Sequence, residues 1–487
     1  MTDGLFFRPN LKSLRRHRCS EWFHDAKLGI LVHWGPYSVP GWAPLTGELM
    51  EVVSRWGWEF WFTNNPYAEW YFNSMRIERS PTYHYHLKVY GDGFSYDRFA
   101  QIFSQESGKR DPKEWVELFK KAGARYIVFT AKHHDGFLLW PSDYPNPQKG
   151  DYCVERDIVG ELADAVRDEG MYMGIYYSSG LDWTFNDRVI RDITDLFDAV
   201  PQSREYGEYV YNHWCELIDR YKPLILWSDI AYPVTGRFLE LIAHYYNILP
   251  DGVINDRWLQ FNPKSRSFTL MKLLLSRKRI RDLLFPHLLK STPSSPHFDF
   301  RTPEYSTYTE TRKEKWESVR ALGYSFGYNR NEGINHVIPI DRLVWLLIDI
   351  VSKNGNLLIG VSPMADGTIP EHQRKRLLEL GEWLSVNGEA IYGSRPWYSA
   401  EGVAREGIAL RFTQKEEALY AILLGRPERK EITIKNLRPP KDAEIQPLGS
   451  DEGVDWRESP SGNLLVRFPA ALKESPAYVI KISPKPE

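Results

Sequence analysis

Short apolar runs recur along most of the chain, and segments with the spacing of amphipathic helices lie between them. Each run is almost continuously apolar, which is typical of strands that are buried on both faces of a parallel sheet. The runs occupy residues 28–34, 125–134, 171–178, 224–229, 252–258 and 356–363. Because strands and helices alternate over more than half of the sequence, we expect the strands to pair in parallel.

Two helices can be predicted in some detail. Between 111 and 123, apolar residues recur at the i, i+3, i+4 and i+7 positions from Trp115 to Ala122. Asp111 and Pro112 favour a helix start, and Gly123 favours a helix end. A second helix is predicted from about residue 157 to 169.

Polar residues follow several of the apolar runs directly. They include HHD at 133–135, SSGLDW at 178–183 and Asp229. A (β/α)8 barrel carries its site at the C-terminal ends of its strands, so we expect an α/β fold with a (β/α)8-like TIM barrel. A doubly wound sheet would place its ligand at the same ends. However, the sequence has no strand-linked G-x-G-x-x-G or Walker A motif, which argues against nucleotide binding.

The pattern changes after about Pro396. The remaining sequence contains short strand-like segments at 408–413, 418–425, 431–436, 463–469 and 477–483, separated by turn residues. This pattern predicts a small antiparallel β-sandwich. We therefore expect a catalytic barrel domain over residues 1–396 and a C-terminal β-sandwich domain over residues 397–487.

Residues 262–297 are both basic and apolar. Such a segment can form an amphipathic helix on a membrane or a partner. The interpretation we favour is an elaborated barrel loop that packs on the body of the protein or on a neighbouring subunit.

Composition narrows the function classes. The 487 residues carry a formal net charge of −2, with 26% charged residues. This balance gives no reason to expect nucleic acid or an anionic membrane as a partner. The chain also has 18 Trp and 28 Tyr residues. Aromatic rings pack against the apolar faces of sugars, although a large aromatic core explains the same count.

The cysteines and the N-terminal sequence indicate an intracellular setting. Cys19, Cys153 and Cys215 are far apart, with no C-x-x-C pair, which argues against a disulfide framework and a zinc site. The first residues lack an apolar signal-peptide core, and no apolar run approaches the ~20 residues that span a bilayer. We therefore expect a cytoplasmic protein.

Three carboxylates are candidates for catalysis. Asp229 ends an apolar strand, where a charge is costly unless it is paired or used, although it could simply cap the next helix. Glu304 follows a proline in RTPEYST, where plain solvent exposure is the alternative. Glu69 is flanked by aromatics in NPYAEWY. A metal site at His133 and His134 is disfavoured, because adjacent strand residues point to opposite faces.

Eight sequence blocks in a fixed order carry a family resemblance. They are WFHDAKLGILVHWGPYSVPGWAP, NPYAEWY, FTAKHHDGFLLWPS, GIYYSSGLDW, LILWSD, VINDRW, SFGYNRNE and SKNGNLLIGVSP. From roughly Trp22 to Trp397, the chain resembles the α-L-fucosidases of glycoside hydrolase family 29. The resemblance implies a retaining exo-glycosidase that removes terminal fucose through a covalent fucosyl-enzyme intermediate.

The resemblance also implies roles for individual residues. Asp229 would be the nucleophile and Glu304 the acid/base, with Glu69 as the alternative acid/base. Contacts to the sugar hydroxyls would come from His33, Glu69, His133, His134, Tyr176 and Arg257, with Trp227 beside the nucleophile. A pocket for the C6 methyl group of fucose would be formed by Leu31, Tyr67 and Phe326.

The resemblance further implies a fucosylated oligosaccharide as substrate, no metal or organic cofactor, and a homo-oligomer. Two alternatives remain. A sugar-binding protein that had lost catalysis would lack one of the two carboxylates, and both are present here. An α-galactosidase is disfavoured by the paired histidines and the apolar methyl pocket.

Overall fold

Eight parallel strands form the centre of the N-terminal part of the chain. The computed structural model describes residues 6–262, 265–275, 277, 295–427, 431–450, 454–468 and 473–486. The sheet order is β5-β4-β3-β2-β1-β8-β7-β6, and its strands are β1 (Leu28–Val32), β2 (Tyr126–Lys132), β3 (Tyr172–Tyr177), β4 (Ile225–Ser228), β5 (Val253–Ile254), β6 (Phe300–Arg301), β7 (Lys315–Ala321) and β8 (Gly355–Val361).

The sheet curls until its two edge strands approach each other. The backbone N–H of Asp299, just before β6, donates to the carbonyl of Ile254 on β5 over 2.9 Å. All other neighbours pair in parallel, for example Leu31 of β1 with Val128 of β2. The predicted (β/α)8-like barrel is therefore confirmed, with a narrow seam between β5 and β6.

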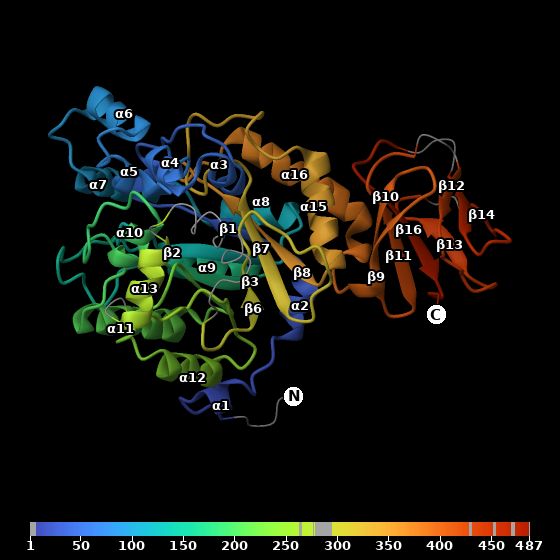
Figure 1. Cartoon of the computed structure of the whole chain (residues 1–487), viewed down its shortest axis with the longest axis horizontal. Coiled ribbons are helices and arrows are strands. Elements are labelled where there is room, and N and C mark those ends of the chain that lie inside the picture. The colour runs from blue at the N-terminus through green and yellow to red at the C-terminus, as the bar shows by residue number, and fades with distance from the viewer. Residues whose placement is uncertain are drawn as a thin grey trace.

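Helices surround this barrel (Figure 1). They are α8 (Lys113–Lys121), α9 (Ile158–Asp168), α11 (Arg204–Tyr221), α12 (Phe238–Ile248), α13 (Arg266–Leu275), α15 (Ile340–Ser352) and α16 (Glu371–Asn387). The two helices predicted in detail are α8 and α9. The N–H of Lys113 donates to Asp111 Oδ1 over 2.9 Å at the start of α8. Asp157 caps α9 by accepting from the N–H of Gly160.

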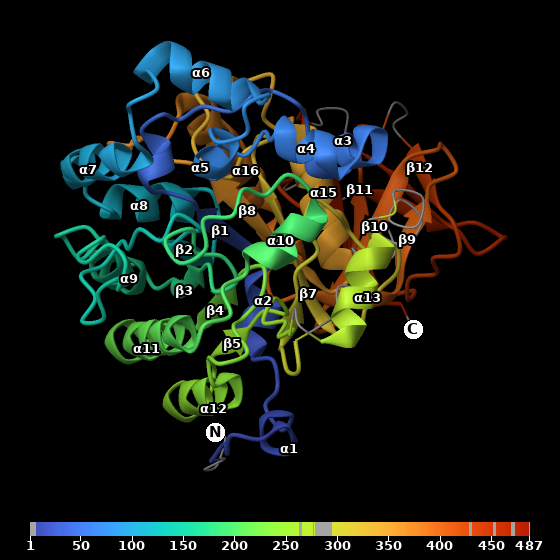
Figure 2. The ribbon, with the colours of Figure 1, turned by 60° about the vertical axis from the view of Figure 1, so that its left-hand side comes forward.

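A long excursion between β1 and α8 adds further helices at one end of the barrel (Figure 2). It contains η1 (Pro36–Ser38), α3 (Leu49–Trp56), α4 (Trp58–Thr63), η2 (Ala68–Trp70), α5 (Tyr71–Ser74), α6 (Pro81–Tyr90), α7 (Tyr96–Glu106) and η3 (Ser107–Lys109). The remaining helices among the described residues are α1 (Leu11–Leu14), α2 (Glu21–Ala26), α10 (Ile193–Ala199) and η4 (Gly388–Ala390). No helix in the described part of the chain is both long and apolar enough to span a membrane.

The C-terminal part consists of two antiparallel sheets, as predicted. A five-stranded sheet has the order β13-β16-β11-β10-β9, and a three-stranded sheet has the order β12-β15-β14. Their strands are β9 (Arg395–Val403), β10 (Ala409–Lys415), β11 (Ala418–Leu423), β12 (Glu431–Ile434), β13 (Glu444–Pro447), β14 (Asp455–Glu458), β15 (Leu464–Arg467) and β16 (Tyr478–Ser483).

Two helices of the barrel join it to these sheets. On α15, the indole N–H of Trp345 donates to the carbonyl of Pro476 over 2.8 Å. On α16, the indole N–H of Trp383 donates to the carbonyl of Ala477 over 3.1 Å. Asp349 of α15 pairs with Arg411 of β10 over 2.6 Å. Figure 1 shows α15 and α16 between the barrel and the C-terminal strands.

The apolar pattern missed β6 and β7. β7 is buried along its whole length, but its sequence KWESVRA carries three charges. In the segment 262–297, residues 266–275 form α13, and its Phe268 stacks on Phe261 with ring centroids 4.7 Å apart. This part of the segment packs on the body of the protein. Residues 263–264, 276 and 278–294 lie outside the described residues.

Candidate active site

Asp229 lies directly after β4, at the C-terminal end of the barrel strands, and its side chain is 11% exposed. Its Oδ2 accepts a hydrogen bond from the Tyr176 hydroxyl over 2.6 Å. Its Oδ1 accepts from Arg257 Nη1 over 2.8 Å and from the backbone N–H of Ile230 over 2.9 Å. The carboxylate is therefore buried and has three donors.

These contacts keep Asp229 ionised. Burial has the largest single effect and acts to raise the pKa of Asp229, but the positive charge of Arg257 and the hydrogen bonds from Arg257 and the Tyr176 hydroxyl together lower it by more. The net effect is a pKa below the ordinary value for aspartate. A carboxylate held in this way is suited to nucleophilic attack rather than to proton donation.

Glu304 lies between β6 and β7, where it bridges to Val319. Its Oε1 accepts from the Tyr67 hydroxyl over 2.9 Å, and its Oε2 accepts from Arg257 Nη2 over 3.1 Å. The Glu304 side chain is 23% exposed, about twice the fraction of Asp229. One guanidinium thus joins an enclosed carboxylate to a more open one.

Arg257 follows β5, and the protein holds it on several sides. Its Nε donates to Thr302 Oγ1 over 3.1 Å, and its Nη2 also donates to the Thr302 carbonyl over 3.2 Å. Its guanidinium carbon lies 4.7 Å from the centre of the Trp227 ring. The resemblance implied a sugar contact for Arg257. In the structure, all three of its nitrogens donate to protein oxygens.

Glu69, the alternative acid/base, has different surroundings. It lies on η2 and is buried, and its Oε2 accepts from the N–H of Gly327 over 2.7 Å and contacts Ser325 Oγ at 3.2 Å. Burial raises the pKa of Glu69 to about 7 despite these contacts. Glu69 therefore stabilises the segment that carries Phe326 through hydrogen bonds, and near neutral pH its carboxyl group is present in both protonated and ionised forms.

Three histidines meet at the ends of β1 and β2. His33 lies with its ring centroid 5.4 Å from that of His133 and 4.9 Å from that of Tyr176. His134 Nδ1 lies 2.6 Å from Ser178 Oγ. Burial lowers the pKa of His33 to about 3 and that of His134 to about 4. These rings are therefore neutral at physiological pH and offer hydrogen bonds rather than charge.

The expectation that His133 and His134 point to opposite faces is wrong. Their ring centroids are 3.9 Å apart. β2 ends at Lys132, so the alternation of a strand does not apply to the two residues that follow. Even so, the described residues contain no group of three or more His, Cys, Asp or Glu side chains that could hold a metal ion.

The residues expected to contact the methyl group share one buried cluster. Leu31, Tyr67 and Phe326 belong to it, together with Trp227. The Tyr67 and Phe326 rings are 5.5 Å apart, edge to face. The structure thus brings all twelve predicted site residues to the same end of the barrel or to the excursion beside it. Their individual roles stay predictions.

Glu317 was not predicted from the sequence. It lies on β7, where its Oε1 accepts from the Trp227 indole N–H over 3.1 Å and its Oε2 accepts from the Tyr126 hydroxyl. Burial raises the pKa of Glu317 to about 7. Glu317 therefore orients the tryptophan beside Asp229 from inside the barrel. In the sequence, Glu317 is a charge two residues after Lys315, in a segment without the apolar pattern of the other strands.

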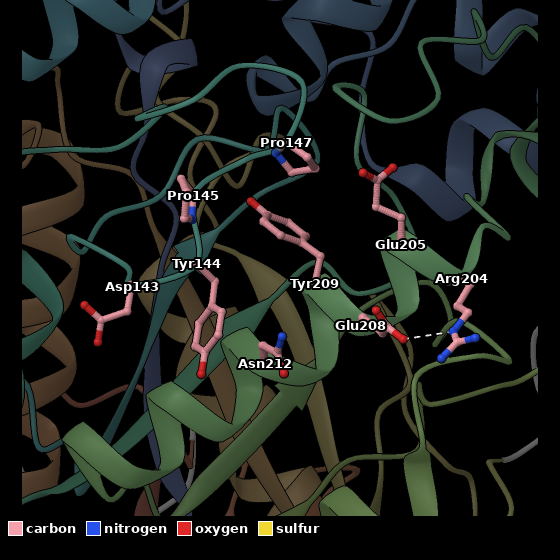
Figure 3. A pocket seen from close by; sticks show the side chains of 9 residues that line it. All are labelled: Asp143, Tyr144, Pro145, Pro147, Arg204, Glu205, Glu208, Tyr209 and Asn212. Atoms are coloured by element: carbon pink, nitrogen blue, oxygen red, sulfur yellow. Dashed lines mark hydrogen bonds and ion pairs between the residues drawn. The ribbon is translucent and has the colours of Figure 1, made fainter.

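A surface pocket lies apart from this site, between residues 143–147 and α11 (Figure 3). It is lined by Asp143, Tyr144, Pro145, Pro147, Arg204, Glu205, Glu208, Tyr209 and Asn212. Arg204 pairs with Glu208 over 2.9 Å on its rim. None of the predicted site residues lines this pocket.

Comparisons with known proteins agree with the geometry. A family model described as alpha-L-fucosidase matches residues 3–389, and one described as alpha-L-fucosidase C-terminal domain matches residues 407–483. Tissue alpha-L-fucosidase of Bos taurus is 31% identical, over 99% of this chain and 92% of its own length. Plasma alpha-L-fucosidase of Homo sapiens is 30% identical, over 95% of this chain and 88% of its own length.

Solved structures show the same likeness. The alpha-fucosidase of Thermotoga maritima, solved in complex with fucose, is 40% identical with a TM-score of 0.82, and the match covers 98% of this chain and 100% of that chain. The resemblance noted in the sequence is confirmed, and the protein belongs to the α-L-fucosidase family of glycoside hydrolases.

Proposed function

We propose that this α-L-fucosidase removes terminal α-L-fucosyl residues from fucosylated oligosaccharides with retention of configuration, with Asp229 as nucleophile and Glu304 as acid/base. The observation that carries the proposal is the Arg257 guanidinium, which donates to both carboxylates from its two terminal nitrogens. Retaining glycosidases use two carboxyl groups that lie close together, about 5–5.5 Å apart. A pair joined through one guanidinium fits that arrangement.

In the first step, an Asp229 oxygen attacks the anomeric carbon as the bond to the leaving oxygen breaks. Glu304 gives its proton to that oxygen, and the product is a fucosyl ester of Asp229. In the second step, Glu304 takes a proton from water while the water oxygen attacks the same carbon. The ester bond breaks and Asp229 regains its charge. The low pKa of Asp229 supports its place as the attacking group.

Fucose is a 6-deoxy sugar, and the surroundings of the two carboxylates suit it. The Tyr67 ring packs edge to face against Phe326, and the Tyr67 hydroxyl donates a hydrogen bond to the Glu304 carboxylate. The neutral histidines provide hydrogen bonds for hydroxyl groups. The Thermotoga maritima relative was solved in complex with fucose and with a mechanism-based inhibitor. These observations support fucose in the subsite beside Asp229.

The decisive experiment compares Glu304→Ala with Glu69→Ala on two substrates. A nitrophenyl fucoside has a leaving group that scarcely needs a proton, whereas a fucosylated oligosaccharide needs one. We expect Glu304→Ala to show a burst of nitrophenolate followed by slow turnover, and to lose activity on the oligosaccharide almost completely. Added azide should attack the accumulated ester and give α-L-fucosyl azide.

Glu310→Ala is a matched control, because Glu310 is an exposed glutamate from the same segment. It should behave as wild type. If Glu69→Ala shows the burst and the azide product while Glu304→Ala loses only modest activity on both substrates, then Glu69 is the acid/base and our assignment is wrong.

A further inference from the structure

The residue after Asp229 has an unusual backbone conformation. Ile230 has a φ of +67°, and the N–H of Ala231 donates to the carbonyl of Asp229 over 2.8 Å. A three-residue turn with this hydrogen bond and a positive φ is the rare and strained form of the γ-turn. A β-branched residue at positive φ is a clear outlier, since its side chain crowds the backbone. Strain of this kind persists only where the surrounding structure enforces it.

The turn fixes one peptide group at both of its ends. The carbonyl of Asp229 accepts from the N–H of Ala231 and also from the N–H of Gly180 over 3.1 Å. The N–H on the other end of the same peptide group is that of Ile230, and it donates to Asp229 Oδ1 over 2.9 Å. The orientation of this peptide group therefore determines where the Ile230 N–H lies relative to the Asp229 carboxylate.

Gly180 supports the turn by close approach. A Cβ atom at residue 180 would lie 2.5 Å from the backbone nitrogen of Ala231 and 3.0 Å from the Cβ of Ile230. Gly180 does not have a positive φ, so the lack of a side chain, rather than backbone freedom, is what this position requires. On the other side, the half-buried Ile230 packs against the cluster that contains Trp227.

We propose that Gly180 and Ile230 are positioning residues for the nucleophile. Together they hold the 229–230 peptide group so that its N–H points at Asp229 Oδ1 and keeps that carboxylate aimed at the anomeric carbon. The inference rests on the proposed role of Asp229. It goes further by assigning a role in the reaction to two residues that need not touch the substrate.

The first test is Gly180→Ala, with Gly93→Ala as the matched control, because Gly93 is exposed and has nothing within 4 Å of its would-be Cβ. The added methyl group must displace the turn. We expect kcat to fall about 10- to 100-fold, as misplacement of a reacting group does, with KM little changed. The acidic limb of the kcat/KM profile should also move up by about one pH unit, because the ionised carboxylate loses a donor.

The acidic limb of the kcat/KM profile reports the pKa of Asp229, because the other groups around this carboxylate are the same in the variant and in wild type. The groups near the carboxylate are Tyr176 on β3, Arg257 after β5, His134 after β2 and His33 after β1, and none of them is substituted. A loss of stability would not shift this limb as long as the variant stays folded over the whole pH range of the assay.

Ile230→Gly is the second test, and it decides the question if Gly180→Ala fails to fold. Glycine adopts positive φ freely, so this variant should fold, but the turn is no longer held by an apolar side chain. We expect a smaller loss of kcat with the same direction of the pH shift. The inference is overturned if the folded variants keep the kcat and the acidic limb of wild type.

Labelling with a 2-fluoro-fucosyl fluoride separates this inference from the proposed function. Peptide mapping of labelled wild-type enzyme should find the label on Asp229. A label elsewhere sinks the proposed function. If wild type is labelled on Asp229 and both Gly180→Ala and Ile230→Gly are labelled as fast as wild type, only the positioning role is refuted.

Discussion

Replacing Arg257 by methionine removes the guanidinium that joins the two carboxylates but keeps an unbranched side chain over Trp227. Asp229 loses a charge-assisted hydrogen bond of 2.8 Å, and Glu304 loses one of 3.1 Å. Both carboxylates then stand close together without a cation between them. The pH dependence of catalysis should report this change directly.

The size of the effect follows from the bond that Asp229 loses. A hydrogen bond to a charged group contributes about 1.5–3 kcal/mol, and one pKa unit corresponds to about 1.4 kcal/mol. Arg257 favours the ionised form of Asp229, so its removal raises the pKa of that carboxyl by about one to two units. The nucleophile must be ionised, so the acidic limb of the kcat/KM profile should move to higher pH by the same amount.

The assay is kcat/KM against pH with a nitrophenyl α-L-fucoside. Arg257→Lys keeps a positive charge without the two-pronged contact, and it should give an intermediate shift. Arg301→Met is the matched control, since Arg301 pairs with the half-exposed Glu314 just before β7, and it should leave the limb unchanged. If Arg257→Met raises KM while its acidic limb coincides with that of wild type, Arg257 binds the sugar only and the electrostatic reasoning fails.

Four further outcomes are expected. Asp229→Gly should lower kcat by several orders of magnitude, and added azide should restore turnover with β-L-fucosyl azide as product. In the wild-type reaction, NMR should detect α-L-fucose as the first product, and detection of β-L-fucose first would refute retention. The ratio of kcat/KM for a fucoside to that for the matching galactoside should be roughly 10²-fold in wild type, and Phe326→Ala should lower it. An unchanged ratio would show that Phe326 does not form part of the methyl pocket. Because burial raises the pKa of Glu317 to about 7, this group alone should cost wild type roughly 3 kcal/mol of stability as pH rises from about 4.5 to 7. Glu317→Gln should therefore make the pH slope of stability in thermal melts shallower by that amount, and identical slopes would contradict it.

Much of the barrel could be predicted because its strands are apolar on both sides. β1 to β5 and β8 follow this rule, and the polar residues after those runs, such as His133 and Asp229, directly follow β2 and β4. β7 could not be found in this way, because Lys315, Glu317 and Arg320 are charged yet buried. Glu317 and Arg320 have partners in distant segments, the Trp227 indole and Glu48, and a local pattern carries no information about them.

The site was predictable in its residue types but not in its local geometry. The two carboxylates Asp229 and Glu304 are joined through Arg257, which follows a third strand, β5. The turn at Ile230 contradicts what a sequence predicts, since isoleucine disfavours positive φ. A conformation that local preferences oppose can only be seen once the surrounding contacts are known. His133 and His134 show the same limit, because the end of β2 decides where their rings point.

The two tryptophans on α15 and α16 affect how the chain can be divided. Trp345 and Trp383 donate to the carbonyls of Pro476 and Ala477, just before β16. A fragment that stopped at residue 396 would leave both indole N–H groups without these acceptors and would uncover the face of α15. The C-terminal sheets therefore cover the outer face of barrel helices α15 and α16, and we expect the whole chain to unfold in one cooperative transition. A chimera that takes its C-terminal sheets from a relative should therefore also take the contacting surfaces of α15 and α16 from that relative.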